Sequence, residues 1–245
     1  MSFEPKDFKA LIQKNISMKY LLYLPKDYNS NSFDSSKKYP LIMFLHGMGE
    51  RGDSPEDLEK VKIHGIPRQI AAGQDFDFII ACPQCPDNKF WGQMVEDEFI
   101  NLIKELIENY NVDTSRIYLT GLSMGGFGTW YYGRRFKSVF AALAPVCAGL
   151  DPIFVDEHLY EVFRYTDTFT IDVYKDIPIW NFHGAKDSLV TLDCSTSIVN
   201  ALNDMDGDIK FTVYPDLDHD SWTPTYENPA LYTWFLSKKN DRFKI

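Results

Sequence analysis

The sequence has no apolar stretch long enough to cross a membrane, and its amino terminus lacks a basic segment followed by an apolar run. A transmembrane helix needs about 20 consecutive apolar residues, and a secretion signal needs that basic and apolar order. We therefore expect a cytoplasmic protein without membrane contacts. A secreted form whose signal has been removed would have the same sequence.

Positive charge is also scarce. The chain carries 25 Lys and Arg against 35 Asp and Glu, a formal net charge of −10. Binding to a phosphate backbone requires a basic stripe, and the sequence contains none. We therefore expect no nucleic-acid partner, and the acidic balance mainly indicates solubility. The sequence carries no signal for an oligomeric state.

Cysteine is rare as well, with four residues. Cys82 and Cys85 form a C-P-Q-C motif that has two interpretations, a redox pair or two thiols in a loop after a strand. We favour the loop, because Pro86 and a polar turn follow Cys85 where a thioredoxin-like site would open a helix. No pattern of ligating residues is typical of a metal site, so we expect no metal.

Most of the chain alternates between apolar runs and amphipathic stretches, and 245 residues are ordinary for one α/β domain, here residues 1–245. The apolar runs are typical of strands and lie at 20–25, 41–45, 76–81, 117–120, 140–146, 178–182 and 209–214. Helical patterns lie at 66–72, 95–110, 194–202 and 229–238. This alternation predicts an α/β protein with a doubly wound, mostly parallel sheet and helices on both faces.

Residues 150–176 interrupt the alternation with an acidic, aromatic segment. The segment follows a predicted strand end, where ligands bind in such sheets. We favour a substrate-facing cap insertion, and the alternative is aromatic packing over the edge of the sheet.

A G-x-S-x-G motif at 121–125 lies between the strand 117–120 and a segment that can be helical. This pattern is typical of a serine held on a sharp strand-to-helix turn, where the flanking glycines let neighbouring backbone pass. The turn would expose the Ser123 hydroxyl at the end of the sheet. The backbone N–H of Met124, at the start of the helix, would then stabilise an oxyanion.

A serine nucleophile needs an imidazole base, because its hydroxyl is protonated at neutral pH. Among five histidines, His219 follows the last predicted strand, where the base is expected. His183 ends the strand 178–182 in the pattern F-H-G-A-K-D, and we interpret it as a structural residue that precedes Asp187. His46 belongs to a glycine-rich turn after the strand 41–45.

The expected acid is Asp187, in the loop after the strand 178–182, and the competing acid is Asp193. The order Ser123, Asp187, His219 is the nucleophile, acid and base order of the α/β-hydrolase fold. Three further aspartates close to His219 in sequence read as solvated loop charges: Asp216, Asp218 and Asp220.

The glycine-rich turn H-G-M-G-E-R-G-D should face the serine and supply the second oxyanion donor, the backbone N–H of Met48. Glu50 and Arg51 follow this residue. Two roles stay open for them: an ion pair that holds the loop, which we favour, or contact of Arg51 with substrate.

The sequence resembles the α/β-hydrolase carboxylesterases of the phospholipase/carboxylesterase or predicted-peptidase group. Five stretches carry the resemblance: H-G-M-G-E-R-G-D, C-P-Q-C-P, residues 112–130, F-H-G-A-K-D and H-D-S-W. That group is similar to the feruloyl and acetyl-xylan esterases of carbohydrate esterase family one. The resemblance implies a cofactor-free serine esterase with Ser123, Asp187 and His219 as its triad and with Met48 and Met124 as oxyanion donors.

We expect the substrate to be a small ester, with feruloyl or another hydroxycinnamoyl ester of plant polysaccharide favoured, because tryptophans near the motifs could stack on an aromatic ring. These tryptophans are Trp91, Trp130 and Trp222. The alternatives are a lysophospholipase-type or peptidase-like acyl hydrolase and, in another class, a non-catalytic ligand receptor on a hydrolase scaffold.

Overall fold

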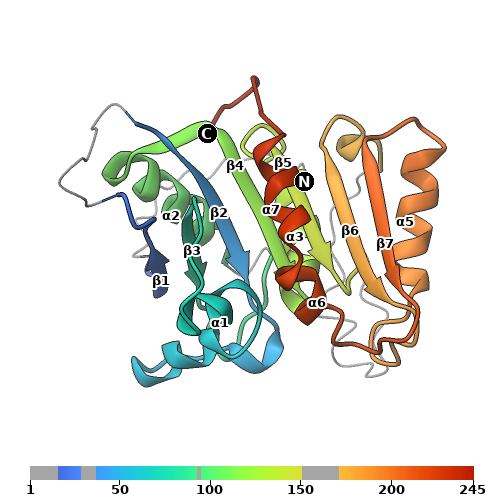
Figure 1. Cartoon of the computed structure of the whole chain (residues 1–245), viewed down its shortest axis with the longest axis horizontal. Helices are drawn as coiled ribbons and strands as arrows, with labels where there is room; N and C mark the ends of the chain where they lie inside the picture. Colours follow the sequence, from blue (N-terminus) through green and yellow to red (C-terminus); the bar gives the residue numbers. More distant parts are fainter. Residues whose placement is uncertain (1–15, 29–36, 93–94, 151–170) are drawn as a thin grey trace, which may run out of the picture.

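Seven strands form one sheet through the middle of the part of the chain described by the computed structural model, residues 16–28, 37–92, 95–150 and 171–245 (Figure 1). The spatial order is β1-β3-β2-β4-β5-β6-β7. The strands are β1 (Tyr20–Tyr23), β2 (Tyr39–Leu45), β3 (Ile79–Pro83), β4 (Val112–Leu122), β5 (Ala142–Val146), β6 (Ile179–Gly184) and β7 (Ile209–Tyr214). Only β1 runs antiparallel to its neighbour, so the expectation of a mostly parallel sheet is confirmed.

The buried strand β2 shows why its sequence is apolar without alternation. Leu41, Met43 and Leu45 point to one core of the protein, whereas Ile42 and Phe44 point to a second core on the other face. All five side chains are fully buried, because helices cover both faces of the sheet.

Helices lie on both sides of the sheet, as the doubly wound pattern predicts (Figure 1). One face packs against α2 (Glu96–Asn109), α3 (Met124–Arg135) and α5 (Asp193–Asn203), and the other against α1 (Gly65–Ala71), α6 (Trp222–Glu227) and α7 (Pro229–Leu236). In α2 the residues at three- and four-residue steps, such as Phe99, Ile103 and Leu106, are buried. None of the helices in the described ranges is long and apolar enough to cross a membrane.

Several predicted boundaries move. The strand that leads to Ser123, β4, begins five residues earlier than expected, at Val112, and β3 begins at Ile79 rather than at Phe76. Phe76 lies before the strand, and its ring packs against Tyr232 of α7, at 4.9 Å between centroids. The sequence also did not predict α6 or the 3-10 helices η1 (Met48–Glu50) and η2 (Glu56–Lys62).

The expected cap insertion falls mostly on 151–170, which lie outside the described residues. Its last part forms the 3-10 helix η4 (Ile171–Tyr174). Tyr174 is buried and donates a hydrogen bond to the backbone oxygen of Trp130 at 2.6 Å. At this end of the segment, the aromatic side chain therefore packs on α3 and does not face a substrate.

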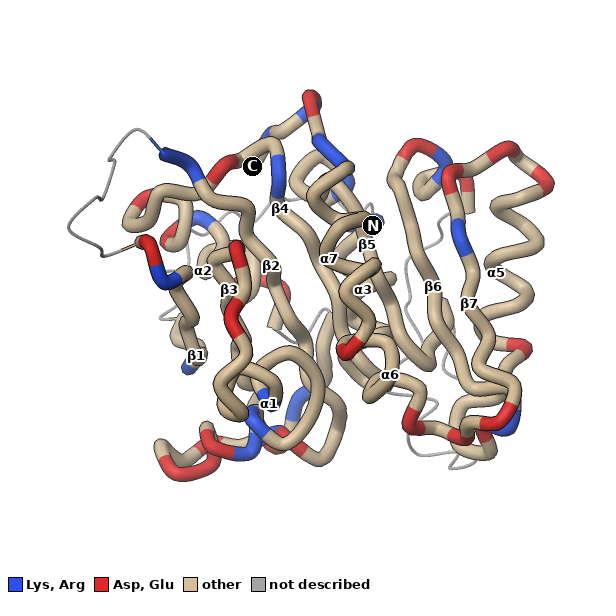
Figure 2. Tube along the Cα trace, in the orientation of Figure 1, with Lys and Arg blue, Asp and Glu red and all other residues tan. Residues whose placement is uncertain are grey.

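The carboxyl ends of the parallel strands meet at one edge of the sheet, drawn at the bottom of Figure 1. The loops there carry many acidic residues mixed with fewer basic ones, whereas the strands are nearly free of charge (Figure 2). Ligands of doubly wound sheets bind at this edge, so the loops after β2, β4, β6 and β7 are the place to look for a site.

The ends of β2 and β4 approach each other so closely that only glycine fits between them. A Cβ atom on Gly125 would lie 2.0 Å from the Leu45 backbone oxygen, and one on Gly121 would lie 2.4 Å from the Gly125 oxygen. The steric role that the sequence predicts for these two glycines is therefore present in the fold.

We expect Gly125→Ala to destabilise the protein by about 3 kcal/mol, because the added methyl group meets backbone that cannot move aside. Gly49→Ala is the matched control, since a Cβ atom at Gly49 meets nothing within 4 Å. Urea unfolding followed by circular dichroism measures both. Equal midpoints for the two variants would contradict the steric argument.

Candidate active site

Ser123 occupies the junction between β4 and α3, with the unusual backbone angles φ 50° and ψ −117°. A left-handed conformation is costly for a residue with a side chain, and it persists only where surrounding contacts enforce it. Here the Ser123 N–H donates to the Val146 oxygen at 3.0 Å, and the Ser123 oxygen accepts from Phe127 at 3.0 Å. These two hydrogen bonds hold the serine in its strained conformation, on the turn that the motif predicts.

A continuous chain of hydrogen bonds joins three of the predicted site residues. The Ser123 hydroxyl lies 2.9 Å from Nε2 of His219, and Nδ1 of the same ring lies 2.7 Å from Oδ2 of Asp187. The three side chains come from the loops after β4, β7 and β6. The competing acid, Asp193, is an exposed residue at the start of α5.

The Asp187 carboxylate is well suited to stay ionised. Burial by itself would raise its pKa, but hydrogen bonds from His183, His219 and the Val190 N–H outweigh this effect. Its pKa therefore lies well below the ordinary value of 3.8. The second oxygen, Oδ1, accepts from the backbone N–H groups of Leu189 at 3.0 Å and Val190 at 2.8 Å.

Asp218 ties the loops after β6 and β7 together. Its Oδ1 accepts hydrogen bonds from the Ser188 N–H at 3.0 Å and from the His219 N–H at 2.8 Å. The loops also meet at Gly184, where a Cβ atom would lie 2.1 Å from the Asp218 oxygen. Asp218 is exposed, as expected of a solvated loop charge, and its carboxylate in addition fixes one loop against the other.

The other two aspartates near His219 also have partners. Asp216 forms an ion pair with Lys186 at 3.0 Å, and Asp220 accepts from both the N–H and the hydroxyl of Thr223 at 3.0 Å. Asp220 thereby binds the first turn of α6. Nearness to His219 in sequence gave no signal for these roles.

The glycine-rich turn after β2 forms η1 and lies against the serine turn. A Cβ atom on Gly47 would lie 2.9 Å from the Leu122 side chain and 3.0 Å from the Glu50 carboxylate. Met48 begins η1, and Met124 begins α3, so each occupies the first position of a helix, whose N–H has no partner within that helix. Their roles as oxyanion donors stay predictions.

Glu50 holds this turn from inside. Its Oε2 accepts the Gly47 N–H at 2.8 Å, and its Oε1 lies 3.9 Å from Nε2 of His64. The side chain is 6% exposed. Burial raises the pKa of Glu50 above its ordinary value of 4.5, against the opposing effects of His64 and the Gly47 N–H. No ion pair with Arg51 is found, so the predicted Glu50–Arg51 pairing is wrong.

Arg51 instead binds backbone oxygens. Its Nε donates to the Met48 oxygen at 3.1 Å and its Nη1 donates to the Lys89 oxygen at 3.3 Å, while the guanidinium lies 4.9 Å from the Phe90 ring centroid. These contacts hold the loop, but through backbone oxygens and a ring rather than through the ion pair that we favoured. Contact of Arg51 with substrate stays a prediction.

Trp91 cannot serve as a stacking surface, so the expectation for this residue is wrong. The indole is 1% exposed, and its Nε1 donates to the His46 oxygen at 2.9 Å. Trp130 is fully buried as well. Residue type and position near a motif do not reveal burial, which is why the sequence misplaced both rings. Trp222 is half-buried, and its ring lies 5.3 Å from that of His219.

The C-P-Q-C segment braces the glycine-rich turn. Gln84 is buried and its amide nitrogen donates to the Glu50 oxygen at 3.0 Å and to the Asp57 oxygen at 2.7 Å. The Cys85 N–H donates to Nε2 of His46 at 3.0 Å, which leaves Nδ1 of His46 to donate to the Gly47 oxygen at 2.6 Å. Burial lowers the pKa of His46 to about 4, consistent with this neutral form.

The two thiols of this segment are buried and unpaired. Burial raises the pKa of the Cys82 thiol, and it raises that of Cys85 to about 12. A reactive redox cysteine needs a thiolate, so the loop interpretation of C-P-Q-C describes the segment better than the redox one.

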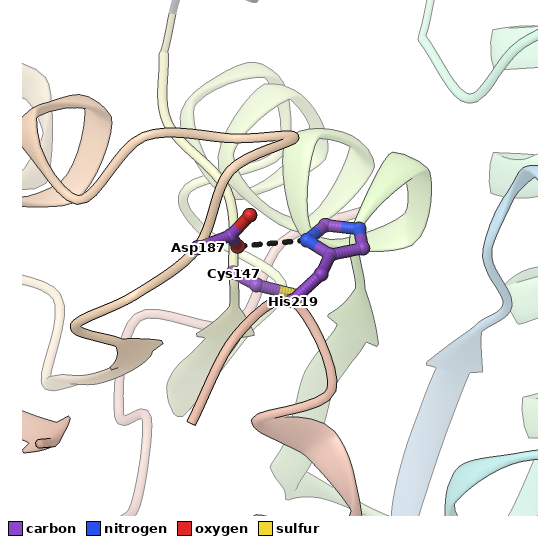
Figure 3. Close-up of side chains that lie close together, drawn as sticks. All are labelled: Cys147, Asp187 and His219. Carbon is purple, nitrogen blue, oxygen red and sulfur yellow. Dashed lines mark hydrogen bonds and ion pairs between the residues drawn. The ribbon is translucent and has the colours of Figure 1, made fainter. Parts of the chain in front are cut away.

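One group of side chains in the described ranges has the spacing of metal ligands: Cys147, Asp187 and His219, whose ligand atoms lie within 4.8 Å of one another. Figure 3 shows Cys147 beside the hydrogen-bonded pair. Burial raises the pKa of the Cys147 thiol, so sulfur is a neutral neighbour here. Nδ1 of His219 is already hydrogen-bonded to Oδ2 of Asp187 at 2.7 Å, an arrangement typical of proton transfer.

The order of the site residues along the chain defines the class of protein. The serine follows β4, the aspartate follows β6 and the histidine follows β7, which is the order of the α/β-hydrolase serine hydrolases. Comparison with known proteins then gives the family. The model of the prolyl oligopeptidase family matches residues 87–240, and the chain belongs to this family of serine hydrolases.

Among its relatives are esterases, which confirms the expected resemblance. The bifunctional acetylxylan esterase/xylanase XynS20E of Neocallimastix patriciarum is 25% identical over 87% of this chain. Feruloyl esterase B of Piromyces equi is 36% identical over 37% of the chain. The crystal structure of a thermostable esterase is 30% identical, with a TM-score of 0.68 over 91% of the chain.

The chain spans only part of each of these relatives. It covers 27% of the Neocallimastix protein, 15% of the Piromyces protein and 60% of the thermostable esterase. The activity and substrate of the whole protein are therefore matters for proposal.

We expect Glu50→Gln to stabilise the protein increasingly as the pH rises above 4.5. A raised carboxyl pKa means that the folded protein favours protonated Glu50, so stability is lost as the pH rises through that pKa. Glutamine keeps an oxygen for the Gly47 N–H but cannot ionise. The lowered pKa of Asp187 acts only below 3.8, outside this range.

Urea unfolding at a series of pH values up to neutrality measures this effect. Glu59→Gln is the matched control, because the Glu59 side chain is 71% exposed and pairs only with Lys62 among the ion pairs found for it. The expected result is a stability gain that grows with pH for Glu50→Gln alone. A gain independent of pH would show that ionised Glu50 does not strain the fold.

Proposed function

We propose that this protein is a serine carboxylic ester hydrolase that works through an acyl-enzyme, with Ser123 as nucleophile, His219 as base and Asp187 as acid. The observation that carries the proposal is the unbroken hydrogen-bond chain from the Asp187 carboxylate through the His219 ring to the Ser123 hydroxyl. Such a chain serves to remove the serine proton as the hydroxyl attacks a carbonyl carbon.

The reaction follows from these contacts. His219 takes the proton of Ser123 at Nε2 during attack, and Asp187 holds the opposite ring nitrogen protonated and the ring oriented. The Met48 and Met124 amides stabilise the resulting oxyanion, each worth about 3 kcal/mol. His219 then protonates the leaving alcohol, and a water molecule repeats the two steps on the acyl-enzyme to release the acid.

We favour an aromatic acyl group, feruloyl or another hydroxycinnamoyl, carried on plant polysaccharide. The half-buried Trp222 ring lies beside His219, and two large apolar side chains near the site are exposed: Ile63 at 51% and Leu189 at 56%. Leu189 lies two residues from Asp187, and Ile63 precedes His64, whose ring contacts Trp222 at 5.3 Å. Two relatives are named as acetylxylan and feruloyl esterases, which supports the same substrate class.

Charge also bears on the alternatives. The loops after β2 and β7 carry more carboxylates than basic groups (Figure 2), which opposes the approach of anionic substrates. These carboxylates are Asp53, Glu56, Asp57, Glu59, Asp216, Asp218 and Asp220. A neutral sugar ester therefore suits the charge of these loops better than a phosphate-bearing lysophospholipid. The family name keeps a peptidase-like acyl hydrolase as the second candidate.

We expect the native protein to hydrolyse methyl ferulate as well as p-nitrophenyl acetate and butyrate, and we expect Ser123→Ala to lower kcat/KM by at least about 1000-fold. Ser197→Ala, on the surface of α5, is the control and should retain the native rates. Release of ferulate and of nitrophenol is followed by absorbance.

Other outcomes would change the assignment. Turnover of nitrophenyl esters alone would leave the serine chemistry but remove the hydroxycinnamoyl substrate. Faster cleavage of a dipeptide p-nitroanilide than of any ester would favour the peptidase. Absence of turnover together with absence of labelling by a fluorophosphonate would favour a non-catalytic receptor.

A further inference from the structure

A cavity between α1 and α6 lies close to the candidate active site, and the proposed mechanism does not use it. Its volume is about 580 Å³, which is ordinary for a small-molecule binding site. The two helices are in contact near the lower edge of the sheet in Figure 1, the edge at which the parallel strands end. The loops that carry Ser123, Asp187 and His219 belong to the same edge. A cavity at this place therefore requires its own explanation.

The walls of the cavity are two helix faces. The lining residues on these faces include Gly65, Arg68 and Gln69 of α1 and Thr223, Tyr226 and Glu227 of α6. Within each helix they are three or four positions apart, so they share one side of it. Gly65 has a φ of 65°, and a Cβ atom on it would lie 2.3 Å from the Phe44 ring. This glycine therefore lets α1 begin close against the sheet, beside α6.

The lining of the cavity is rich in hydrogen-bonding groups. It contains one guanidinium, two amides, one hydroxyl and one carboxylate, those of Arg68, Gln69, Gln74, Thr223 and Glu227. Together they offer both donors and acceptors, and the single positive charge is balanced by a single negative one. A neutral ligand with many hydroxyl groups matches this lining, whereas an anion, a cation or an apolar chain would leave part of it unpaired. These are the properties of a saccharide.

Most of these groups are available to a ligand. The side chains of Arg68, Gln74 and Glu227 are exposed, and no hydrogen bond or ion pair joins them to another residue within the described ranges. Oε1 of Gln69 is buried and accepts no hydrogen bond. The Thr223 hydroxyl donates to Asp220 at 3.0 Å and keeps its lone pairs as acceptors. Buried polar atoms without partners are rare in folded proteins, so the lining indicates a binding surface.

Two aromatic rings connect the cavity with the reacting imidazole. His64 directly precedes Gly65, and Trp222 directly precedes Thr223. The Trp222 ring lies 5.3 Å from the His64 ring on one side and 5.3 Å from the His219 ring on the other. The alcohol oxygen of an ester must reach Nε2 of His219 to receive its proton, so the alcohol part of the substrate starts beside this residue. A saccharide that extends from there passes Trp222, whose ring can pack on its apolar C–H groups.

We propose that the cavity between α1 and α6 is a subsite for the saccharide part of the ester, the part that leaves as the alcohol. This inference rests on the proposed function, because it takes His219 as the group that protonates the alcohol. The cavity binds the sugar and does not touch the acyl group. It therefore raises kcat/KM for a saccharide ester above that for a simple alkyl ester of the same acid, since binding of a remote part of the substrate stabilises the transition state.

The first test measures sugar binding without any reaction. Xylotriose, a neutral saccharide that carries no ester, is titrated into the 15N-labelled native protein. We expect saturable shifts of the backbone amide signals at residues 65–74 and 223–227, and we expect Gln74→Ala to raise the Kd by about three- to tenfold through the loss of one hydrogen-bonding group. Absence of shifts, or shifts confined to other parts of the chain, would overturn the proposal.

The second test compares two esters of one acid, the feruloyl ester of xylotriose and methyl ferulate. The measured quantity is the ratio of their kcat/KM values. We expect Arg68→Ala and Gln74→Ala each to lower this ratio by about three- to tenfold, because only the saccharide ester reaches the cavity. Lys104→Ala is the matched control, since this exposed residue lies on α2 across the sheet, and it should keep the native ratio.

The two tests separate the possible failures. A merely structural role for Arg68 and Gln74 would lower both kcat/KM values together and keep their ratio, and this result would overturn the subsite. Shifts at the cavity caused by a neutral dipeptide, with none caused by xylotriose, would replace the saccharide by a peptide. If no ester is hydrolysed at all, the proposed function fails, while the titration still decides whether the cavity binds a sugar.

Discussion

The rest of the structure depends on the contact between the backbone of β2 and the start of α3. Gly125 presses against the Leu45 oxygen and Gly121 against Gly125 itself, so no side chain separates the strand that carries the glycine-rich turn from the strand that carries the serine. The same region holds Ser123 in its strained conformation, and the glycine-rich turn lies against Leu122 at the end of β4. A stiff parallel sheet, buried on both faces, supplies the packing that holds such a strained turn in place.

Around this contact, buried polar groups are held by partners from distant parts of the chain. His46, Gln84 and Glu50 form a set of hydrogen bonds behind the glycine-rich turn, and Asp187 with its two histidines forms another behind the serine. Each set restricts backbone that would otherwise be a mobile loop. Preorganisation of this kind is what electrostatic stabilisation of a transition state requires.

The sequence was sufficient to predict the sheet and to group Ser123, Asp187 and His219, because parallel strands end at one edge and the residues after those ends must meet there. It failed where the outcome depended on packing across the fold. The sequence predicts a binding role for Trp91, but its buried indole donates to the backbone oxygen of His46. It predicts a loop charge at Asp218, but not that this carboxylate joins two loops. The hydrogen bonds of His183 are made to Ser195 and Val190, which no local pattern places beside it.

The position of β7 at the end of the described sheet has a further consequence. This strand is hydrogen-bonded to β6 alone, yet the loop that follows it carries His219. Edge strands take part in local opening at a lower free energy than central strands, which exchange their amide hydrogens only on global unfolding. The imidazole therefore follows an edge strand of the sheet, whereas the serine follows its central strand. On warming, the two should separate before the fold is lost, so inactivation precedes denaturation.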